Sequence, residues 1–345
     1  MDDGQMISAN LSRATPMRAT PSASRAELPG DALPVIYIVG SGRSGSTLLE
    51  RVLGQMPGYV NVGELIQLAR HVAPRNERCG CGQAFADCPF WTAVGKQAFG
   101  GWDNRYLESV CRLHGRVARQ RYLPWLPATE RAGRGRRADL AALGACYESL
   151  YRAIAAESGA ACVVDKSGDV RQVLMLAGAG IDVRVIHLIR DVRGVAYSMS
   201  KRHMASPDPL NRTEFTWRTT PAGAAALWVA VLSEEKLLRR RGVPVARMRY
   251  EDFVCQPREA VEEALAQLGL SVGPSGLAHI GDRRVVLPLS HGLSGNPSRF
   301  RQGELILWVD EAWRDQMSRR DRIVVTMIGL PYLRRYYARR PGEPR

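Results

Sequence analysis

Long apolar segments are missing from this sequence of 345 residues. No stretch approaches the roughly 18 uncharged apolar residues that a membrane-spanning helix needs. Residues 1–33 are rich in Ser, Thr, Ala, Pro and Arg, and they contain no apolar core of the kind that signal peptides have. We therefore expect a soluble, cytoplasmic protein without a transmembrane segment, and a disordered N-terminal tail over residues 1–33.

Cysteine is also scarce, since the chain has seven, and in a cytoplasmic protein this number argues against a disulfide framework. Cys79, Cys81 and Cys88 lie close together in the sequence, which suggests a zinc knuckle with His71 as a possible fourth ligand. Structural zinc sites prefer two to four residues between paired cysteines, and Cys79-Gly-Cys81 has one. We therefore favour a small docked loop without metal, in which the cysteines act as compact apolar residues.

The balance of charge is strongly basic, with a formal net charge of +14 and a pI near 9.9. Such a balance fits a protein that binds a multiply anionic nucleotide, and it also fits a nucleic-acid binder. An Arg-rich composition of the whole chain would account for the same charge. Because no RNA- or DNA-binding motif accompanies the basic residues, we expect no nucleic-acid partner.

The most informative segment is residues 35–49, VIYIVGSGRSGSTLL. Its apolar start predicts a short buried parallel strand, and its three glycines allow successive amides to surround an anion. A helix that starts near Ser46 adds its positive N-terminal end. This pattern indicates a phosphate-binding loop. The expected nucleotide contacts are Gly42, Arg43, Ser44, Gly45, Ser46 and Thr47.

The loop departs from the nucleoside-triphosphatase pattern Gly-x-x-x-x-Gly-Lys-Ser/Thr at one position, because Ser46 stands where the lysine belongs. The cation of the loop is Arg43 instead. A P-loop kinase therefore stays an alternative but a disfavoured one, whereas a nucleotide with a 5′-phosphate can still be held by the amides, the hydroxyls and Arg43. A non-catalytic basic module that binds polyanions is the second alternative.

A second anion-binding pattern follows the predicted buried strand over residues 183–189. Arg190 comes directly after this strand, and Ser198 comes two turns into the predicted helix from Val192 to Lys201. An arginine at the carboxyl end of a strand and a serine on the next helix can converge on one anion at the edge where open parallel sheets bind ligands.

The two patterns together resemble the 5′-phosphosulfate loop and the 3′-phosphate motif of sulfotransferases that use 3′-phosphoadenosine 5′-phosphosulfate (PAPS). RMRYEDF at 247–253 and HGLSGNPSRFRQGE at 291–304 resemble further elements of that family. The resemblance runs from about residue 34 onward and is greatest to the bacterial branch that resembles Golgi and tyrosylprotein enzymes. It implies in-line transfer of a sulfuryl group from PAPS to a hydroxyl or amine acceptor, without a metal.

Strands that alternate with helices predict an α/β fold. The resemblance makes this a P-loop-like three-layer fold with a central parallel sheet of about four or five strands. We expect one domain over residues 34–345, with insertions at about 66–160 and 203–220 that form the acceptor pocket. Small-molecule, carbohydrate, lipid and peptide acceptors all suit this fold, and no motif in the insertions selects among them.

The resemblance also implies roles for individual residues. Glu64, after a glycine, corresponds to a catalytic base; its alternative is a carboxylate that complements a helix dipole. Lys166, after a predicted strand over Ala161–Asp165, is the candidate that stabilises the bridging oxygen, and its alternative is a surface lysine. Arg43 would bind the phosphosulfate or form a structural salt bridge. The basic loop at 291–304 supplies two more candidates for contact with the nucleotide, Arg299 and Arg301, of which Arg301 is favoured.

Overall fold

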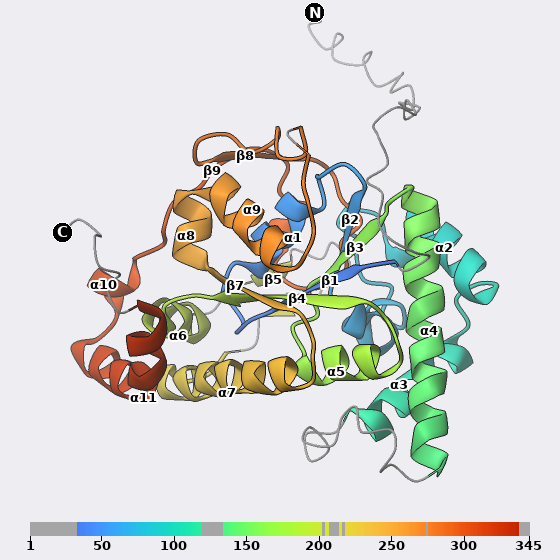
Figure 1. The fold of residues 1–345 in the computed structure, drawn as a ribbon, viewed down its shortest axis with the longest axis horizontal. Helices are drawn as coiled ribbons and strands as arrows, with labels where there is room; N and C mark the ends of the chain where they lie inside the picture. Colours follow the sequence, from blue (N-terminus) through green and yellow to red (C-terminus); the bar gives the residue numbers. More distant parts are fainter. Residues whose placement is uncertain are drawn as a thin grey trace, which may run out of the picture.

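The computed structural model describes residues 33–118, 134–201, 204–206, 214–215, 218–273 and 275–337. The expected disordered tail lies outside these residues except for Leu33, and so does most of the predicted insertion at 203–220. A five-stranded parallel sheet with the order β2-β3-β1-β4-β7 runs through the middle of the molecule (Figure 1). Its strands are β1 (Val35–Val39), β2 (Tyr59–Gly63), β3 (Cys162–Asp165), β4 (Val183–Ile189) and β7 (Val245–Arg249). The predicted α/β class and strand number are confirmed.

The central strand β1 is apolar along its whole length because both faces of the sheet are covered. Successive side chains point to opposite faces, so Ile36 and Ile38 enter one core while Tyr37 enters the other. Val35 pairs with a residue of β3 on one side and of β4 on the other. This register aligns the carboxyl ends of the three strands.

Helices cover both faces of the sheet and complete a three-layer arrangement (Figure 1). One face carries α1 (Ser46–Leu53), α8 (Tyr250–Cys255) and α9 (Pro257–Gln267). The opposite face carries α5 (Val170–Gly178), α6 (Val192–Ser200) and α7 (Pro221–Arg240), and α11 (Arg319–Tyr337) packs on the last two. In the described part of the chain, no helix is long and apolar enough to cross a membrane.

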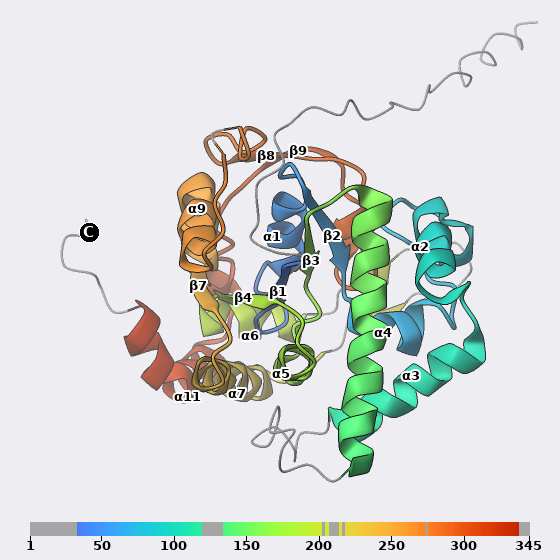
Figure 2. The same ribbon diagram turned by 45° about the vertical axis from the view of Figure 1, so that its right-hand side comes forward.

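The first predicted insertion is mainly helical. The long helix α4 (Arg134–Ser158) stands beside β3, with α2 (Pro89–Phe99) and α3 (Asn104–Val117) on its outer side (Figure 2). The cysteine segment that was expected to be a docked loop leads directly into α2, because Cys88 precedes Pro89. The remaining short elements are η1 (Leu65–Gln67), η2 (Leu68–Val72), η3 (Phe85–Asp87), β5 (Met204–Ser206), β6 (Glu214–Phe215), the hairpin of β8 (Arg284–Leu287) and β9 (Gly303–Ile306), η6 (Pro297–Phe300) and α10 (Trp313–Gln316).

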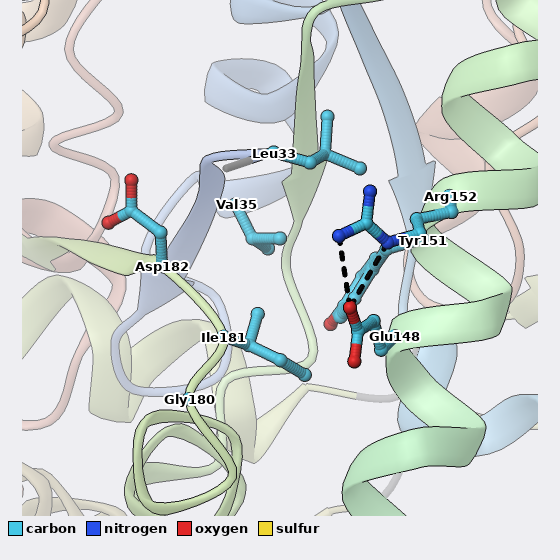
Figure 3. Close-up of a pocket in the computed structure, with 8 residues that line it drawn as sticks. All are labelled: Leu33, Val35, Glu148, Tyr151, Arg152, Gly180, Ile181 and Asp182. Carbon is cyan, nitrogen blue, oxygen red and sulfur yellow. Dashed lines mark hydrogen bonds and ion pairs between the residues drawn. The ribbon is translucent and has the colours of Figure 1, made fainter. Parts of the chain in front are cut away.

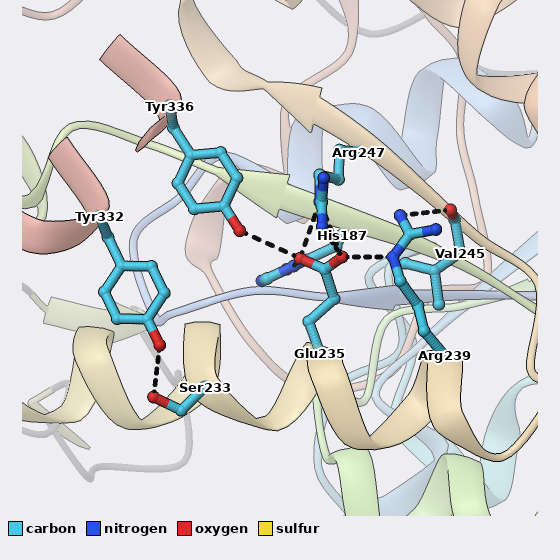
Figure 4. Close-up of polar contacts among 8 residues, drawn as sticks. All are labelled: His187, Ser233, Glu235, Arg239, Val245, Arg247, Tyr332 and Tyr336. Atoms are coloured by element: carbon cyan, nitrogen blue, oxygen red, sulfur yellow. Dashed lines mark hydrogen bonds and ion pairs between the residues drawn. The ribbon is translucent and has the colours of Figure 1, made fainter. Parts of the chain in front are cut away.

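A buried charged cluster attaches α7 to the sheet (Figure 4). Glu235 of α7 accepts hydrogen bonds from His187 Nδ1 of β4 at 3.0 Å and from Arg239 Nε at 2.7 Å, and it pairs with Arg247 of β7 at 2.7 Å. Burial would raise the pKa of Glu235, but these three partners hold it below its usual range. His187, which is buried in β4, is therefore a structural partner of Glu235.

Sequence analysis assigns no strand to residues 59–63. They form the edge strand β2, because Val60 and Asn61 find parallel partners in β3. Five residues are too few to show the alternation of a strand in the sequence. On the other side, Leu293 pairs with this edge: its amide donates to the Val62 carbonyl at 2.9 Å, and its carbonyl accepts from the Glu64 amide at 2.8 Å.

The contact between β2 and Leu293 predicts the effect of a single methyl group. Gly63 has φ 79°, and a Cβ there would overlap the backbone of Leu293. Gly242 has a similar φ of 74° but no atom within 4 Å of the same position. Gly242→Ala should cost about 1–2 kcal/mol of backbone strain, and Gly63→Ala about 2–5 kcal/mol. Equal losses of unfolding free energy in urea would contradict a tight contact with Leu293.

Candidate active site

The candidate site lies where the parallel strands end. The glycine-rich loop follows β1, and Glu64, Lys166 and Arg190 follow β2, β3 and β4 directly. Because the strands run in the same direction, all four segments reach the same edge of the sheet, which is where open α/β sheets bind ligands. The tertiary structure thus brings together residues that are up to about 150 positions apart in the sequence.

The loop after β1 has the backbone of an anion cradle. Arg43 and Gly45 have positive φ values of 68° and 94°, which turn successive amides the same way. A Cβ at Gly45 would lie 2.6 Å from the Tyr250 ring, so only glycine fits there. Ser44 is fully buried, and its Oγ has no hydrogen-bond partner among the described residues. An unsatisfied hydroxyl beside the start of α1 suits the oxygen of a bound phosphate or sulfate.

A second group of polar side chains lies next to this loop, between β1 and β4. Arg43 Nε donates to Ser198 Oγ at 3.0 Å, and Arg190 Nη1 donates to the Arg43 carbonyl at 3.0 Å. Arg190 also pairs with Asp310 at 3.0 Å and lies 4.6 Å from the centre of the Tyr250 ring. Burial and the nearby Arg190 lower the pKa of Arg43. Two guanidinium groups this close together favour an anion between them.

The structure places Arg43 beside residues that the sequence prediction assigned to another pocket. Arg43 was assigned to the phosphosulfate, whereas Arg190 and Ser198 were assigned to a separate 3′-phosphate pocket. In the structure the Arg43 side chain bonds to Ser198, so the three residues form one group. We call Arg43, Arg190 and Ser198 the anion corner.

The buried ion pair of the site joins Lys166 to Glu64 at 2.8 Å. The Lys166 side chain is 2% exposed and that of Glu64 is 26% exposed, so the carboxylate is the more accessible partner. Burial alone would lower the pKa of Lys166, but Glu64 and Glu50 outweigh it and the pKa is raised. Lys166 is therefore a charged, buried donor and not a surface lysine.

Backbone contacts hold this pair in place. The Lys166 amide donates to the Gly63 carbonyl at 2.9 Å, and the Ile66 amide donates to Ser167 Oγ at 3.0 Å. Asp165 in turn accepts from the amide and the hydroxyl of Ser167, at 2.8 and 2.6 Å. Burial raises the pKa of Asp165 to about 6, although Ser167 and Tyr151 oppose the rise. The segments that carry Glu64 and Lys166 are thus bonded directly to each other.

Sequence analysis missed Glu50 of α1. It is 1% exposed, it lies near Lys166 and Glu64, and its Oε2 has no hydrogen-bond partner in the part of the chain that the structure describes. Burial raises its pKa to about 8, and Lys166 limits the rise. The available signal was a single acidic residue within the apolar run that starts α1.

The two arginines of the 291–304 loop, of which the prediction favoured Arg301, differ in burial. The Arg299 side chain is 6% exposed, donates to the Gly295 carbonyl at 3.0 Å and is close enough to Glu64 to interact electrostatically. Arg301 is exposed. Gly295 lies against both Lys166 and Glu64, so its segment borders the ion pair.

A pocket of about 70 Å³ lies at the other edge of the sheet (Figure 3). It is lined by Leu33 and Val35 at the start of β1, by Asp182 before β4, and by the ion pair of Glu148 and Arg152, whose atoms are 3.0 Å apart. The amino ends of the strands form this edge. The pocket is therefore separate from the candidate site.

A parallel sheet with a phosphate-type loop, a second anion corner and a buried Lys–Glu pair defines an enzyme that transfers a group from an anionic nucleotide. The model of the sulfotransferase family matches residues 34–274. The chain therefore belongs to the sulfotransferase family, and as a PAPS-dependent enzyme it transfers the sulfuryl group to an acceptor.

A search of curated proteins gave no match. Three solved structures are similar at low identity. The sulfotransferase domain from the curacin biosynthetic pathway is 15% identical, with 87% of this chain and 98% of that chain covered and a TM-score of 0.46. The sulfotransferase domain of the Synechococcus PCC 7002 olefin synthase is 18% identical (87% and 94% covered, TM-score 0.44), and a mouse sulfotransferase complexed with PAP is 12% identical (88% and 86% covered, TM-score 0.41). The family assignment rests on the family model and not on these structures.

The raised pKa of Glu50 predicts a pH-dependent stability. Its value is about 8 in the folded chain against 4.5 in the unfolded chain, so the stability that the protonated carboxyl contributes is complete below pH 4.5 and is lost as the pH rises through 8. In Glu50→Gln this loss is absent. The unfolding free energy of the variant relative to the unmodified chain should therefore increase with pH over this range, by up to about 1.4 kcal/mol per pH unit.

Urea unfolding at a series of pH values measures this difference. Glu262→Gln, at an exposed position of α9, is the matched control and should give a constant difference. A pH-independent difference for Glu50→Gln would mean that Glu50 ionises normally in the folded chain.

Proposed function

We propose that the anion corner binds the 3′-phosphate of PAPS and that the loop after β1 binds its 5′-phosphosulfate. The observation that carries this proposal is the contact of Arg43 with both Ser198 and Arg190 beside the buried Ser44. The donor would be held by Gly42, Arg43, Ser44, Gly45, Ser46, Thr47, Arg190 and Ser198. Arg299 supports the loop at Gly295 and adds positive charge near Glu64, whereas the exposed Arg301 reaches the donor only if its loop moves.

Lys166 and Glu64 are proposed to act on the two atoms between which the sulfuryl group moves, namely the bridging phosphate oxygen and the acceptor oxygen or nitrogen. Glu64 accepts the proton of the acceptor hydroxyl or amine as the acceptor atom bonds to sulfur. The bond from sulfur to the phosphate oxygen breaks at the same time, and Lys166 stabilises the negative charge that develops on that oxygen. The 2.8 Å contact between them supports this pairing, because protonation of Glu64 frees the ammonium of Lys166 for the departing oxygen.

We further propose that residues 34–345 act as one domain in the cytoplasm. The hairpin of β8 and β9 and helix α11 lie beyond the matched residues 34–274, yet Val285 and Leu307 share a core with β1, and Val325 shares one with α6 and α7. The structure joins none of the seven cysteines in a disulfide, and the proposal of a reducing compartment rests on this. The acceptor is proposed to be a hydroxyl or amine of a small molecule, carbohydrate, lipid or peptide, and mass spectrometry of extracts with and without the gene would find it.

Binding of the product tests the anion corner. Arg190→Ala should weaken adenosine 3′,5′-bisphosphate at least about tenfold and leave AMP nearly unchanged, because a charge-assisted hydrogen bond contributes about 1.5–3 kcal/mol. Titration calorimetry measures both ligands. Arg240→Ala, which removes an exposed arginine from the end of α7, controls for the loss of net charge. Equal weakening of AMP and the bisphosphate would refute the assignment of the 3′-phosphate.

The role of Glu64 is tested by Glu64→Gln, which keeps an oxygen that can accept the hydrogen bond of Lys166 but cannot take up a proton. As a general base, Glu64 predicts a loss of about 10²–10⁴ in kcat, with bisphosphate affinity unchanged and the acidic limb of the pH–rate profile removed. If Glu64 only positions Lys166, the variant should keep near-normal kcat. That outcome, with an alcohol acceptor whose chemical step limits the rate, would end the base assignment.

A further inference from the structure

Three cysteines and a histidine that sulfuryl transfer does not use converge outside the candidate site. The side-chain ligand atoms of Cys79, Cys81, Cys88 and His291 all lie within 4.8 Å of one another. Cys79 and Cys88 are fully buried, whereas Cys81 and His291 are partly exposed. The sulfurs are not bonded, because Cys88 Sγ lies 3.6 Å from Cys79 Sγ and 3.7 Å from Cys81 Sγ, against about 2.05 Å in a disulfide.

Four of the six separations among the ligand atoms agree with the edges of a tetrahedron around one metal ion. Bonds of about 2.3 Å to sulfur and about 2.0 Å to nitrogen place two sulfurs about 3.8 Å apart, and a sulfur and a nitrogen about 3.5 Å apart. The observed sulfur pairs are at 3.6 and 3.7 Å. His291 Nδ1 lies 3.6 Å from Cys79 Sγ and 3.3 Å from Cys88 Sγ.

We propose that Cys79, Cys81, Cys88 and His291 bind one zinc ion in a closed Cys₃His site. Thiolate and imidazole ligands select zinc over magnesium and calcium, which prefer oxygen. Four protein ligands leave no open position for water or substrate, so the ion stabilises structure and takes no part in the transfer.

The surroundings of the sulfurs suit a cation. Cys88 immediately precedes helix α2, whose N-terminal end favours a thiolate, and the backbone amides of Trp91 and Cys81 act in the same direction on Cys88 and Cys79. Binding of zinc would supply the positive charge that the buried sulfurs need for ionisation.

The tertiary structure points to a different fourth ligand from the His71 that the sequence suggested. A tight turn, in which the Gly82 amide donates to the Cys79 carbonyl at 2.8 Å, lets a Cys-Gly-Cys segment bring both sulfurs to one centre. His71 is exposed and lies outside the group. The fourth ligand is His291, more than 200 positions after Cys88 in the sequence.

The location of the site gives the ion a definite structural task. The His291 ring stacks on Phe90 with centroids 4.8 Å apart, and its carbonyl accepts from Trp91 Nε1 at 2.9 Å. Two residues later, Leu293 pairs with β2 beside Glu64. Zinc would therefore fasten the helical insertion to the loop that borders the Lys166–Glu64 pair.

Elemental analysis of the full chain tests the proposal. The protein should be expressed without a histidine tag and purified in reducing, chelator-free buffer, and it should contain about one zinc per chain. Cys88→Ser and His291→Asn should lose most of the metal. Cys255→Ser, which removes an exposed thiol outside the group, should keep all of it. Stoichiometric iron, or metal content unchanged in both ligand variants, would overturn the zinc assignment.

Cobalt keeps the test decisive if the ligand variants fail to fold. Reduced, metal-free unmodified chain titrated with Co²⁺ should develop the intense visible bands of tetrahedral cobalt together with thiolate-to-cobalt charge transfer, and zinc should displace them. The weak spectrum of octahedral cobalt, or no binding, would overturn the proposal. A native disulfide between two of the three cysteines in metal-free protein, detected by mass spectrometry, would overturn it as well.

Discussion

Five parallel strands end at one edge of the sheet, and the position of every polar group in the site follows from that alignment. Backbone hydrogen bonds between β1 and its neighbours set the register, so the glycine-rich loop lies between the segment after β3 and the segment after β4. Lys166 therefore lies on one side of the loop and Arg190 on the other. The Lys166–Glu64 pair, proposed for proton and charge transfer, thus lies on the opposite side of the loop from Arg190 of the anion corner, which is proposed to bind the 3′-phosphate.

Lys166 and Arg190 are buried at this edge, and each lies against a carboxylate. Lys166 keeps its positive charge against the cost of burial because Glu64 and Glu50 lie close to it. Arg190 forms an ion pair with Asp310 and donates a hydrogen bond to the Arg43 carbonyl. Such pairs are preorganised because they need little reorientation when charge moves, and they avoid the penalty of an isolated buried ion. Glu50 differs, because its burial disfavours the charged carboxylate and raises its pKa to about 8.

The segment around residues 291–300 connects parts of the molecule that are distant in the sequence. Leu293 extends the edge of β2, Gly295 lies against Lys166 and Glu64, and His291 stands among the cysteines of the first insertion. The loop thus contacts both the first insertion and the Lys166–Glu64 pair.

The sequence alone determined the α/β class, the central strands and the phosphate-type loop, because apolar runs and a glycine-rich turn are properties of contiguous residues. It also indicated Lys166 and Arg190 as residues that follow predicted strands, and Glu64 as a site residue that follows a glycine. Only the tertiary structure decided that residues 59–63 form a strand, that Arg43 lies on Ser198, that Arg299 and not Arg301 is buried near Glu64, and that His291 joins the cysteines. These outcomes depend on contacts between segments 100 to 250 positions apart, whose distances are set by packing and not by any local pattern.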